Sequence, residues 1–131
     1  MTLIPKTKPL RDKKYHNSFK VEGEHVCILS GSLLPDFAHI RHGFFATGMK
    51  PGDNLVMPLR HDLHLEQGES EIQFWIKYFD RIPEHMRLRA IEEMAKPGEK
   101  TDIMEIVKQI ARNYYESWKT RSGGLNGNYT L

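Results

Sequence analysis

Four of the seven histidines of the 131-residue chain lie within residues 36–64, DFAHIRHGFFATGMKPGDNLVMPLRHDLH. An imidazole has a pKa of about 6.5 in water, so it can take up a proton or bind a divalent ion near neutral pH. His39 and His64 flank a glycine-rich stretch and Asn54. His61 lies three residues before His64, a spacing that puts both on one face of a helix. These residue types and spacings favour one compact site for acid–base or metal chemistry.

The histidines need structural elements that bring them together. Residues 24–43 have β-favouring ends around a turn region of Gly, Ser, Pro and Asp, which predicts a β-hairpin ending near His39. A glycine-rich loop over 43–54 follows, and its PGDN end is typical of a turn. A short helix is expected to begin near 58–60 and to carry the last two histidines of the window.

Helices are expected on both sides of this window. Residues 1–9 are interpreted as an extended arm, and a short helix is predicted over about 11–19. In the last third, one amphipathic helix precedes a second that begins at Pro83 and ends at 96–98, and a third begins at a capping pair, Asp102 and Glu105. We assign their apolar stripes to core packing. These are Ile72, Trp75, Ile76 and Phe79 in the first helix, and Ile103, Ile106, Val107, Ile110, Tyr114 and Trp118 in the third.

The composition indicates a single globular domain with a modest core, since 39% of the residues are hydrophobic. One cysteine excludes an internal disulfide framework and fits the cytoplasm, and no run of about 20 apolar residues is present to cross a membrane. The net charge of +2 does not by itself argue for nucleic acid. The first 20 residues, however, carry six Lys or Arg against one Asp, which fits either a phosphate-binding arm or a solvated terminus.

The histidine window also carries two short motifs, AHI at 38–40 and NLVMPLRHDLH at 54–64, within a broader string AHIRHG…TGMKPGDNLVMPL…H…GE…FW. In these residues the chain resembles the HNH endonuclease family, in particular phage and prophage HNH nucleases of the recombination-enhancing kind. The resemblance covers roughly residues 11–76. It implies a ββα-metal (His-Me finger) fold, in which a β-hairpin, a loop and a helix surround one metal ion.

With this resemblance, the expected fold class is α+β, with a small ββα-metal core, an N-terminal helix and about three C-terminal helices. The expected organisation is a flexible basic arm (1–10), the HNH-like core (11–68), a helical part that packs on the core (69–119) and a flexible tail (120–131).

The implied function is that of a metal-dependent DNA endonuclease of phage or prophage origin, acting in recombination or DNA processing in the cytoplasm of a bacterial host. It would nick or cleave phosphodiester bonds with low sequence specificity and leave a 5′ phosphate. His39 matches the family's general base, Asn54 matches the asparagine that orients the segment of that base, and His64 matches a metal ligand on the helix.

The chain departs from the family pattern in two places. Ala38, directly before the matched base, cannot bind a metal ion. Many family members also hold a zinc ion in a four-cysteine knuckle, and one thiol cannot close such a tetrahedral site, so we expect no structural zinc. The knuckle positions are occupied here by Cys27, Ser30, Arg60 and Leu63.

The metal ligands must therefore come from other residues. His64 is the first candidate, followed by His61 and Asp36, with Glu66 or Glu69 as weaker options. Two imidazoles and a carboxylate suit Mn²⁺, Ni²⁺ or Zn²⁺, whereas Mg²⁺ prefers oxygen and would use the substrate phosphate. The expected cofactor is one divalent ion, Mg²⁺ or Mn²⁺ in the first place and Zn²⁺ or Ni²⁺ as alternatives.

Basic side chains in and near the window are candidates for contacts with DNA phosphates, namely Arg41, His42, Lys50, Arg60, Lys13 and Lys14. Two other functions stay open at this point. The chain could be a DNA-binding module that keeps the fold without catalysis, or a helical adaptor that docks onto a recombination or packaging protein. No membrane partner is expected, and the oligomeric state is left open.

Overall fold

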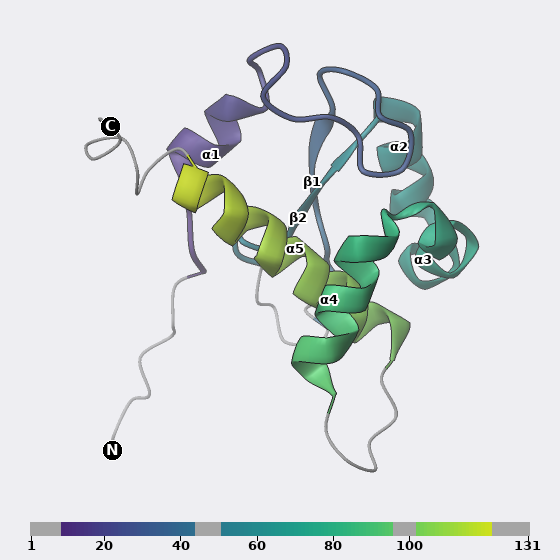
Figure 1. The fold of residues 1–131 in the computed structure, drawn as a ribbon. Helices are drawn as coiled ribbons and strands as arrows, with labels where there is room; N and C mark the ends of the chain where they lie inside the picture. Colours follow the sequence, from purple (N-terminus) through teal and green to yellow (C-terminus); the bar gives the residue numbers. More distant parts are fainter. Residues whose placement is uncertain (1–8, 44–50, 96–101, 122–131) are drawn as a thin grey trace, which may run out of the picture.

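The structure of the protein, a computed structural model, describes residues 9–43, 51–95 and 102–121 (Figure 1). In this part of the chain, five α-helices and one two-stranded antiparallel sheet form an α+β fold, as expected. In chain order the elements are α1 (Lys13–Ser18), β1 (Asp36–His39), β2 (Val56–Leu59), α2 (His61–Glu69), α3 (Glu71–Tyr78), the 3₁₀ helix η2 (Phe79–Arg81), α4 (Glu84–Met94) and α5 (Ile103–Lys119). The predicted basic arm before residue 9, Lys50, the helix end at 96–98 and the tail after residue 121 lie outside the described residues.

The two strands pair across a long connection rather than a tight turn. Asp36 lies opposite Leu59, and His39 lies opposite Val56. The hairpin predicted within residues 24–43 is therefore wrong, because that segment supplies only β1 and an isolated bridge farther upstream. The helix predicted near 58–60 begins just after β2, so strand, strand and helix follow one another along the chain.

The segment 24–43 contacts β2 instead of forming a hairpin of its own. Cys27, Ile28 and Leu29 in this segment are all buried. The amide of Ile28 instead donates a hydrogen bond to the carbonyl of Pro58, which fixes the run beside β2. All four residues of β2 are buried, so the sheet is covered at this strand.

The first helix is short and is held at both its start and its core face. Asp12 caps it by accepting a hydrogen bond from the amide of Tyr15, in agreement with a helix predicted over about 11–19. The second oxygen of Asp12 accepts a hydrogen bond from the hydroxyl of Tyr115 in α5. Tyr15 and Trp118 pack together with three further buried side chains, Phe19, Val56 and Tyr115. The N-terminal helix is thus fixed against the last helix and the sheet.

The apolar stripe predicted for α3 is only partly correct. Trp75 is buried, but Ile72 and Ile76 are 44% and 51% exposed. Phe74 and Tyr78 take their place in the core. The buried face of α3 is shifted by about one residue from the predicted face. The larger aromatic side chains are therefore buried, and the isoleucines are exposed.

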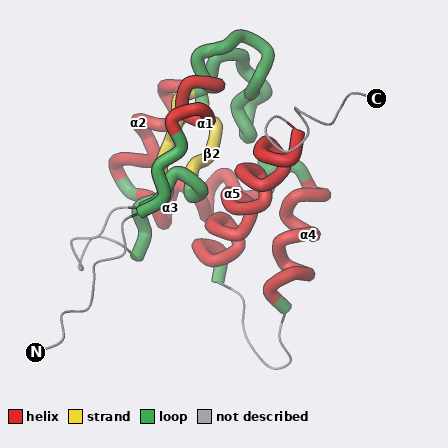
Figure 2. The backbone as a smooth tube through the Cα atoms, turned by 90° about the vertical axis from the view of Figure 1, so that its left-hand side faces the viewer, coloured by secondary structure: helices red, strands yellow, loops and turns green. Residues whose placement is uncertain are grey.

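α5 covers the sheet from one side, and α4 packs on α5 (Figure 2). Pro83 directly precedes α4, as predicted, and Asp102 caps α5 by accepting a hydrogen bond from the amide of Met104. The face of α5 predicted to be apolar is buried at Ile106, Val107, Ile110 and Trp118, and half-buried at Ile103 and Tyr114. This face packs on β2 and α3. Among the helices of the described segments, none has the length and apolar character needed to cross a membrane.

Candidate functional site

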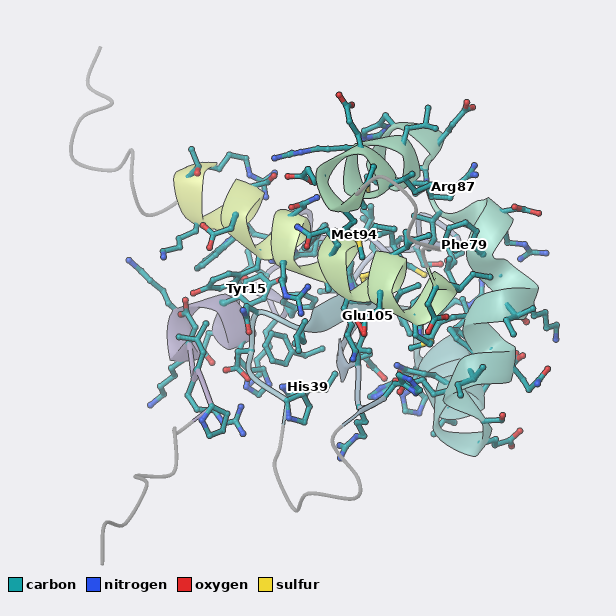
Figure 3. The ribbon with its side chains drawn as sticks, turned by 90° about the horizontal axis from the view of Figure 1, so that it is seen from below. Tyr15, His39, Phe79, Arg87, Met94 and Glu105 are labelled. Atoms are coloured by element: carbon teal, nitrogen blue, oxygen red, sulfur yellow. The ribbon has the colours of Figure 1, made fainter. Side chains whose placement is uncertain are left out.

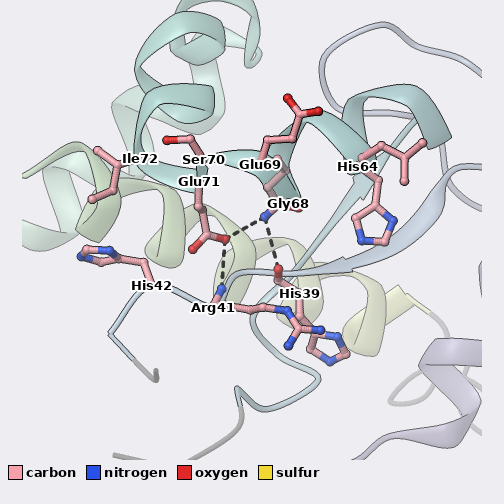
Figure 4. A pocket seen from close by; sticks show the side chains of 11 residues that line it. His39, Arg41, His42, His64, Gly68, Glu69, Ser70, Glu71 and Ile72 are labelled. Carbon is pink, nitrogen blue, oxygen red and sulfur yellow. Dashed lines mark hydrogen bonds between the residues drawn. The ribbon is translucent and has the colours of Figure 1, made fainter. Parts of the chain in front are cut away.

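A cavity of about 530 Å³ lies where the end of β1 meets α2 and α3 (Figure 4). Both His39 and His64 line it, together with Arg41 and His42 from the chain that leaves β1. The remaining walls come from Leu65, Gln67, Gly68, Glu69, Ser70, Glu71 and Ile72. The structure therefore brings the two histidines that match the family motif into the wall of one cavity.

His39 is the last residue of β1 and is paired with a buried carboxylate. Its Nε2 lies 2.9 Å from Oδ1 of Asp53, whose side chain is 8% exposed. Burial lowers the pKa of His39 below its usual range, and the Arg11 and Arg41 charges act in the same direction, although the Asp53 carboxylate opposes them. The ring is therefore neutral at pH 7. In that state Nε2–H donates to Asp53, and the lone pair on Nδ1 is left as a proton acceptor.

Asp53 is itself held in place by the start of α1. Its Oδ2 accepts a hydrogen bond of 2.8 Å from the backbone amide of Asp12. The Arg11 guanidinium donates to the carbonyl of Pro51 at 2.9 Å and lies 3.4 Å from Oδ1 of Asp53. Arg11 and Arg41 line a smaller hollow of about 150 Å³ with His39 and Pro51, so two cations flank the ring.

The expected role of Asn54 is not found in the geometry. Within the described segments, the side chain of Asn54 makes no hydrogen bond to the segment of His39. The residues next to the two positions are joined instead by a backbone hydrogen bond from the Ile40 amide to the Leu55 carbonyl. The neighbouring acid, Asp53, contacts His39 instead. Sequence reasoning missed Asp53 and Arg11 because the motif drew attention to the asparagine. The only available signal was an acid beside it in the PGDN turn.

The three side chains predicted as metal ligands meet at the other end of β1. Nδ1 of His61 lies 2.7 Å, and Nδ1 of His64 2.9 Å, from the same oxygen, Oδ2 of Asp36. Burial alone would raise the pKa of Asp36, but the hydrogen bonds from the two histidines outweigh it and lower the pKa. Because Nδ1–H of each ring donates to the carboxylate, the Nε2 lone pairs stay available. Asp36 therefore orients the two rings.

The Nε2 atoms of His61 and His64 are chemically suited to bind a divalent ion, because the bonds to Asp36 fix the tautomer of each ring. In the described parts of the chain, no three or more His, Cys, Asp or Glu side chains surround a common ion position. Ala38 is fully buried, and Glu66 is tied to Lys77 and to the hydroxyl of Tyr78. An ion here would take two ligands from the protein and the others from substrate phosphate and water.

A hydrogen-bond network joins the end of β1 to α2 and α3. The side-chain amide of Gln67 donates to the carbonyl of His39 at 3.2 Å and to Oε2 of Glu71 at 2.8 Å. The backbone amide of Arg41 donates to the same Glu71 oxygen at 3.0 Å (dashed lines in Figure 4). These bonds hold the chain after β1 against both helices, which fixes the shape of the cavity.

The residues predicted to contact DNA occupy different settings. Arg41 is exposed and His42 half-buried at the cavity, and Lys13 and Lys14 are exposed on α1 beside Arg11. Arg60 is paired with Asp62 at the start of α2 and does not line the cavity. Figure 3 shows His39 at the periphery of the molecule, clear of α5. The basic residues that lie nearest to His39 are thus Arg11 and Arg41.

Comparison with known proteins gave no match: no family model, no curated protein and no solved structure matches this chain.

Proposed function

We propose that the protein is a metal-dependent DNA endonuclease of HNH type. The observation that carries the proposal is the shared cavity: His39 and His64 line it from consecutive strand, strand and helix elements, and Arg11 and Arg41 flank His39. The site offers a neutral imidazole that can act as a general base and two oriented imidazoles that can hold a metal ion. The two guanidinium groups can contact a phosphate.

In this proposal His39 is the general base. Its neutral ring takes a proton on Nδ1 from a water molecule that attacks the phosphorus, while Nε2–H remains bonded to Asp53. The carboxylate stabilises the imidazolium that forms and holds the ring in the required tautomer. A positioned general base contributes about 10²–10⁴-fold to the rate. Asp53 is therefore proposed as the residue that orients the base, in the role expected for Asn54.

His61 and His64 would hold the divalent ion through Nε2, with Asp36 fixing both rings. When bound, the ion stabilises negative charge on the leaving 3′ oxygen. Mg²⁺ or Mn²⁺ is proposed first because substrate phosphate and water would supply most of the shell as oxygen ligands, with Zn²⁺ or Ni²⁺ as alternatives.

Binding to DNA is proposed to rest on phosphate contacts from Arg11, Arg41, Lys13 and Lys14, with His42 at the cavity. Such contacts carry no direct sequence information, so specificity would be low and salt dependence strong. The same proposal includes a role in recombination or DNA processing in the bacterial host of a phage or prophage, with a recombination protein as partner.

The experiment is a plasmid-nicking assay with Mg²⁺, Mn²⁺ or a chelator. Wild-type protein is expected to convert supercoiled into open-circular DNA only with metal, and His39→Ala to remove nicking while DNA binding in a gel shift survives. His85→Ala is the matched control, since His85 is exposed on α4 away from this cavity. Equal nicking by His39→Ala and wild type would contradict the proposal.

A second candidate function is a DNA-binding module without catalysis. It is favoured by the buried Ala38, which gives no ligand, and by the lack of a three-ligand group in the described segments. This function predicts a gel shift with no nicking under any metal.

A further inference from the structure

The smaller hollow beside His39 is lined by two arginines. Its four lining residues are Arg11, His39, Arg41 and Pro51. Pro51 has no backbone N–H, and Nε2–H of His39 is already bonded to Asp53. The donors available to the hollow therefore belong to the two guanidinium groups. Its volume of about 150 Å³ is well below the roughly 300–1,000 Å³ of pockets that hold a whole small ligand, so the hollow suits one compact group.

Arg11 is anchored on one side and open on the other. Its hydrogen bonds to described residues all come from Nη1, which donates to the carbonyl of Leu10 at 3.2 Å, to the carbonyl of Pro51 at 2.9 Å and to Oδ1 of Asp53 at 3.4 Å. A guanidinium has five N–H donors, so Nε and Nη2 keep donors that none of these bonds uses. The side chain is 49% exposed. Arg11 is thus a fixed cation with an accessible donor edge.

Arg41 supplies the second cation. Its backbone amide is bonded to Glu71, but its exposed guanidinium makes no hydrogen bond or ion pair within the segments that the structure describes. Figure 4 draws this guanidinium beside the ring of His39, in agreement with their shared place in the hollow. The carboxylate of Asp53 is already shared between His39 and Arg11. Two positive charges therefore face one partly used negative charge, which favours binding of an anion.

The hollow and the larger cavity share a wall. His39 and Arg41 line both, whereas Arg11 lines only the hollow and His64 only the cavity. In the proposed reaction the scissile phosphate lies in the cavity, where it can meet both His39 and His64. Neighbouring phosphates of one strand are separated by a single sugar. A strand held in the cavity can therefore place its next phosphate in the hollow.

We propose that the smaller hollow binds a non-scissile phosphate, the neighbour of the phosphate that is cleaved, through Arg11 and Arg41. The inference rests on the proposed function in taking a DNA strand as the substrate. It adds that a good substrate carries at least two consecutive phosphates, and that this second contact needs no metal ion. Arginine suits such a site because its planar guanidinium can donate two parallel N–H bonds to one phosphate.

The first test compares two substrates, with wild-type protein and Arg11→Ala in the presence of Mn²⁺. Plasmid DNA carries neighbouring phosphates, whereas bis(p-nitrophenyl) phosphate is a single phosphodiester. Loss of a hydrogen bond to a charged group should lower kcat/KM for plasmid nicking by about 10- to 100-fold and leave hydrolysis of the small diester within about twofold. If Arg11 acted only by holding Asp53, both substrates would be slowed equally. That result, or unchanged plasmid nicking, would overturn the inference.

Two further variants control for charge. Arg81→Ala removes the same charge from an exposed arginine of η2 that lines neither the cavity nor the hollow, and we expect it to nick plasmid like wild type. Arg11→Lys keeps the charge but loses the paired donors, so its plasmid nicking should lie between those of wild type and Arg11→Ala. Equal losses in Arg11→Ala and Arg81→Ala would indicate a general effect of charge and would overturn the inference.

The second test detects the site without catalysis. Metal-free wild-type protein is titrated with inorganic phosphate, and the Nε–Hε signals of the arginines are followed by ¹⁵N NMR. The signals of Arg11 and Arg41 should shift along one saturable curve in the millimolar range, and that of Arg81 should not. Sodium chloride at equal ionic strength should not reproduce the shifts. Shifts that do not saturate, or that chloride reproduces, would overturn the inference.

These outcomes separate the inference from the proposed nuclease. Plasmid nicking by wild type, with both substrates slowed equally in Arg11→Ala, removes only the phosphate site. If no metal supports hydrolysis of either substrate, the nuclease is removed and the phosphate titration decides the site alone. The titration uses wild-type protein, so it stands even if a variant does not fold.

Discussion

Nε2 of His39 lies 2.9 Å from Oδ1 of Asp53, and this pair joins the end of β1 to the turn before β2. Asp53 is nearly inaccessible to water, and its second oxygen is bonded to the backbone at the start of α1. The ring of His39 is therefore held through Nε2 by a carboxylate that is itself fixed, and Nδ1 is the nitrogen that is proposed to accept a proton. The first two predictions depend on this relationship.

Replacing the carboxylate should impair catalysis more than binding. In Asp53→Asn the amide no longer stabilises the imidazolium, and the ring loses its fixed tautomer, so we expect nicking to fall by about 100-fold or more. The measurement is the initial rate of plasmid nicking, beside affinity from a gel shift. Asp62→Asn, an exposed acid paired with Arg60, is the control and should nick like wild type. A nicking rate in Asp53→Asn within about twofold of wild type would rule out the proposed role.

Nicking should depend on pH through His39. Burial lowers the pKa of His39, with Arg11 and Arg41 adding to the effect and Asp53 opposing it. Because the base must be neutral, the rate should rise with pH and level off, with a midpoint below the ordinary value of about 6.5. The check is a pH–rate profile at saturating metal. In Asp53→Asn, removal of the opposing carboxylate should move the midpoint to still lower pH, and a shift to higher pH would contradict this assignment.

Asp36 should control metal affinity without being a ligand. Its oxygen accepts Nδ1–H from both His61 and His64, and loss of such an orienting carboxylate commonly weakens metal binding by about 10- to 100-fold. We expect this loss in Asp36→Ala and no measurable binding in His64→Ala, with Mn²⁺ followed by calorimetry. Asp80→Ala, an exposed acid in η2, is the control. Unchanged Mn²⁺ affinity in both Asp36→Ala and His64→Ala would show that the ion binds at other residues.

Stability should fall in acid because of His25, which lies far from the cavity. Its ring is buried between the Ser18 hydroxyl and the Tyr114 hydroxyl, at 2.7 Å from each. Burial, with the charge of Arg121, lowers the pKa of His25 to about 4. The unfolded chain therefore binds the proton first as pH falls, so this contribution to stability is complete above about pH 6.5 and is lost toward pH 4. By about pH 4.5 the loss should be on the order of 2 kcal/mol.

The measurement is urea unfolding at neutral pH and at about pH 4.5. Because carboxylates such as Asp36 also titrate in acid, the comparison is the difference between wild type and His25→Gln, which should lose less of its free energy of unfolding between the two conditions. His85→Gln, at an exposed histidine, should behave like wild type. An equal loss in wild type and His25→Gln would contradict the assignment.

The sequence predicted the helices that carry their own local signals. Asp12 and Asp102 cap α1 and α5, and Pro83 precedes α4, where a short polar side chain or a fixed φ favours a helix start. The buried face of α5 followed directly from its 3.6-residue period. For α3 the same pattern failed because two overlapping apolar faces exist, and packing selected the one with Phe74 and Tyr78.

The pairing of the strands depended on contacts that are distant in sequence. The turn residues and β-favouring ends of 24–43 favoured a hairpin within this segment, but the bonds of β1 go to β2, beyond the connecting loop. The candidate site also depends on contacts that are distant in sequence. Asp36, His61 and His64 were expected together and do meet, whereas the partner of His39 is Asp53, which only the path of the chain places there.

The most direct test of the central claim is a crystal structure of His39→Ala with Mn²⁺ and a DNA oligonucleotide, with the ion identified by its anomalous signal. We predict one ion on Nε2 of His64, sharing a phosphate oxygen with DNA whose scissile phosphate faces position 39. An ion bound away from His64, or a DNA backbone that passes elsewhere on the surface, would contradict the account.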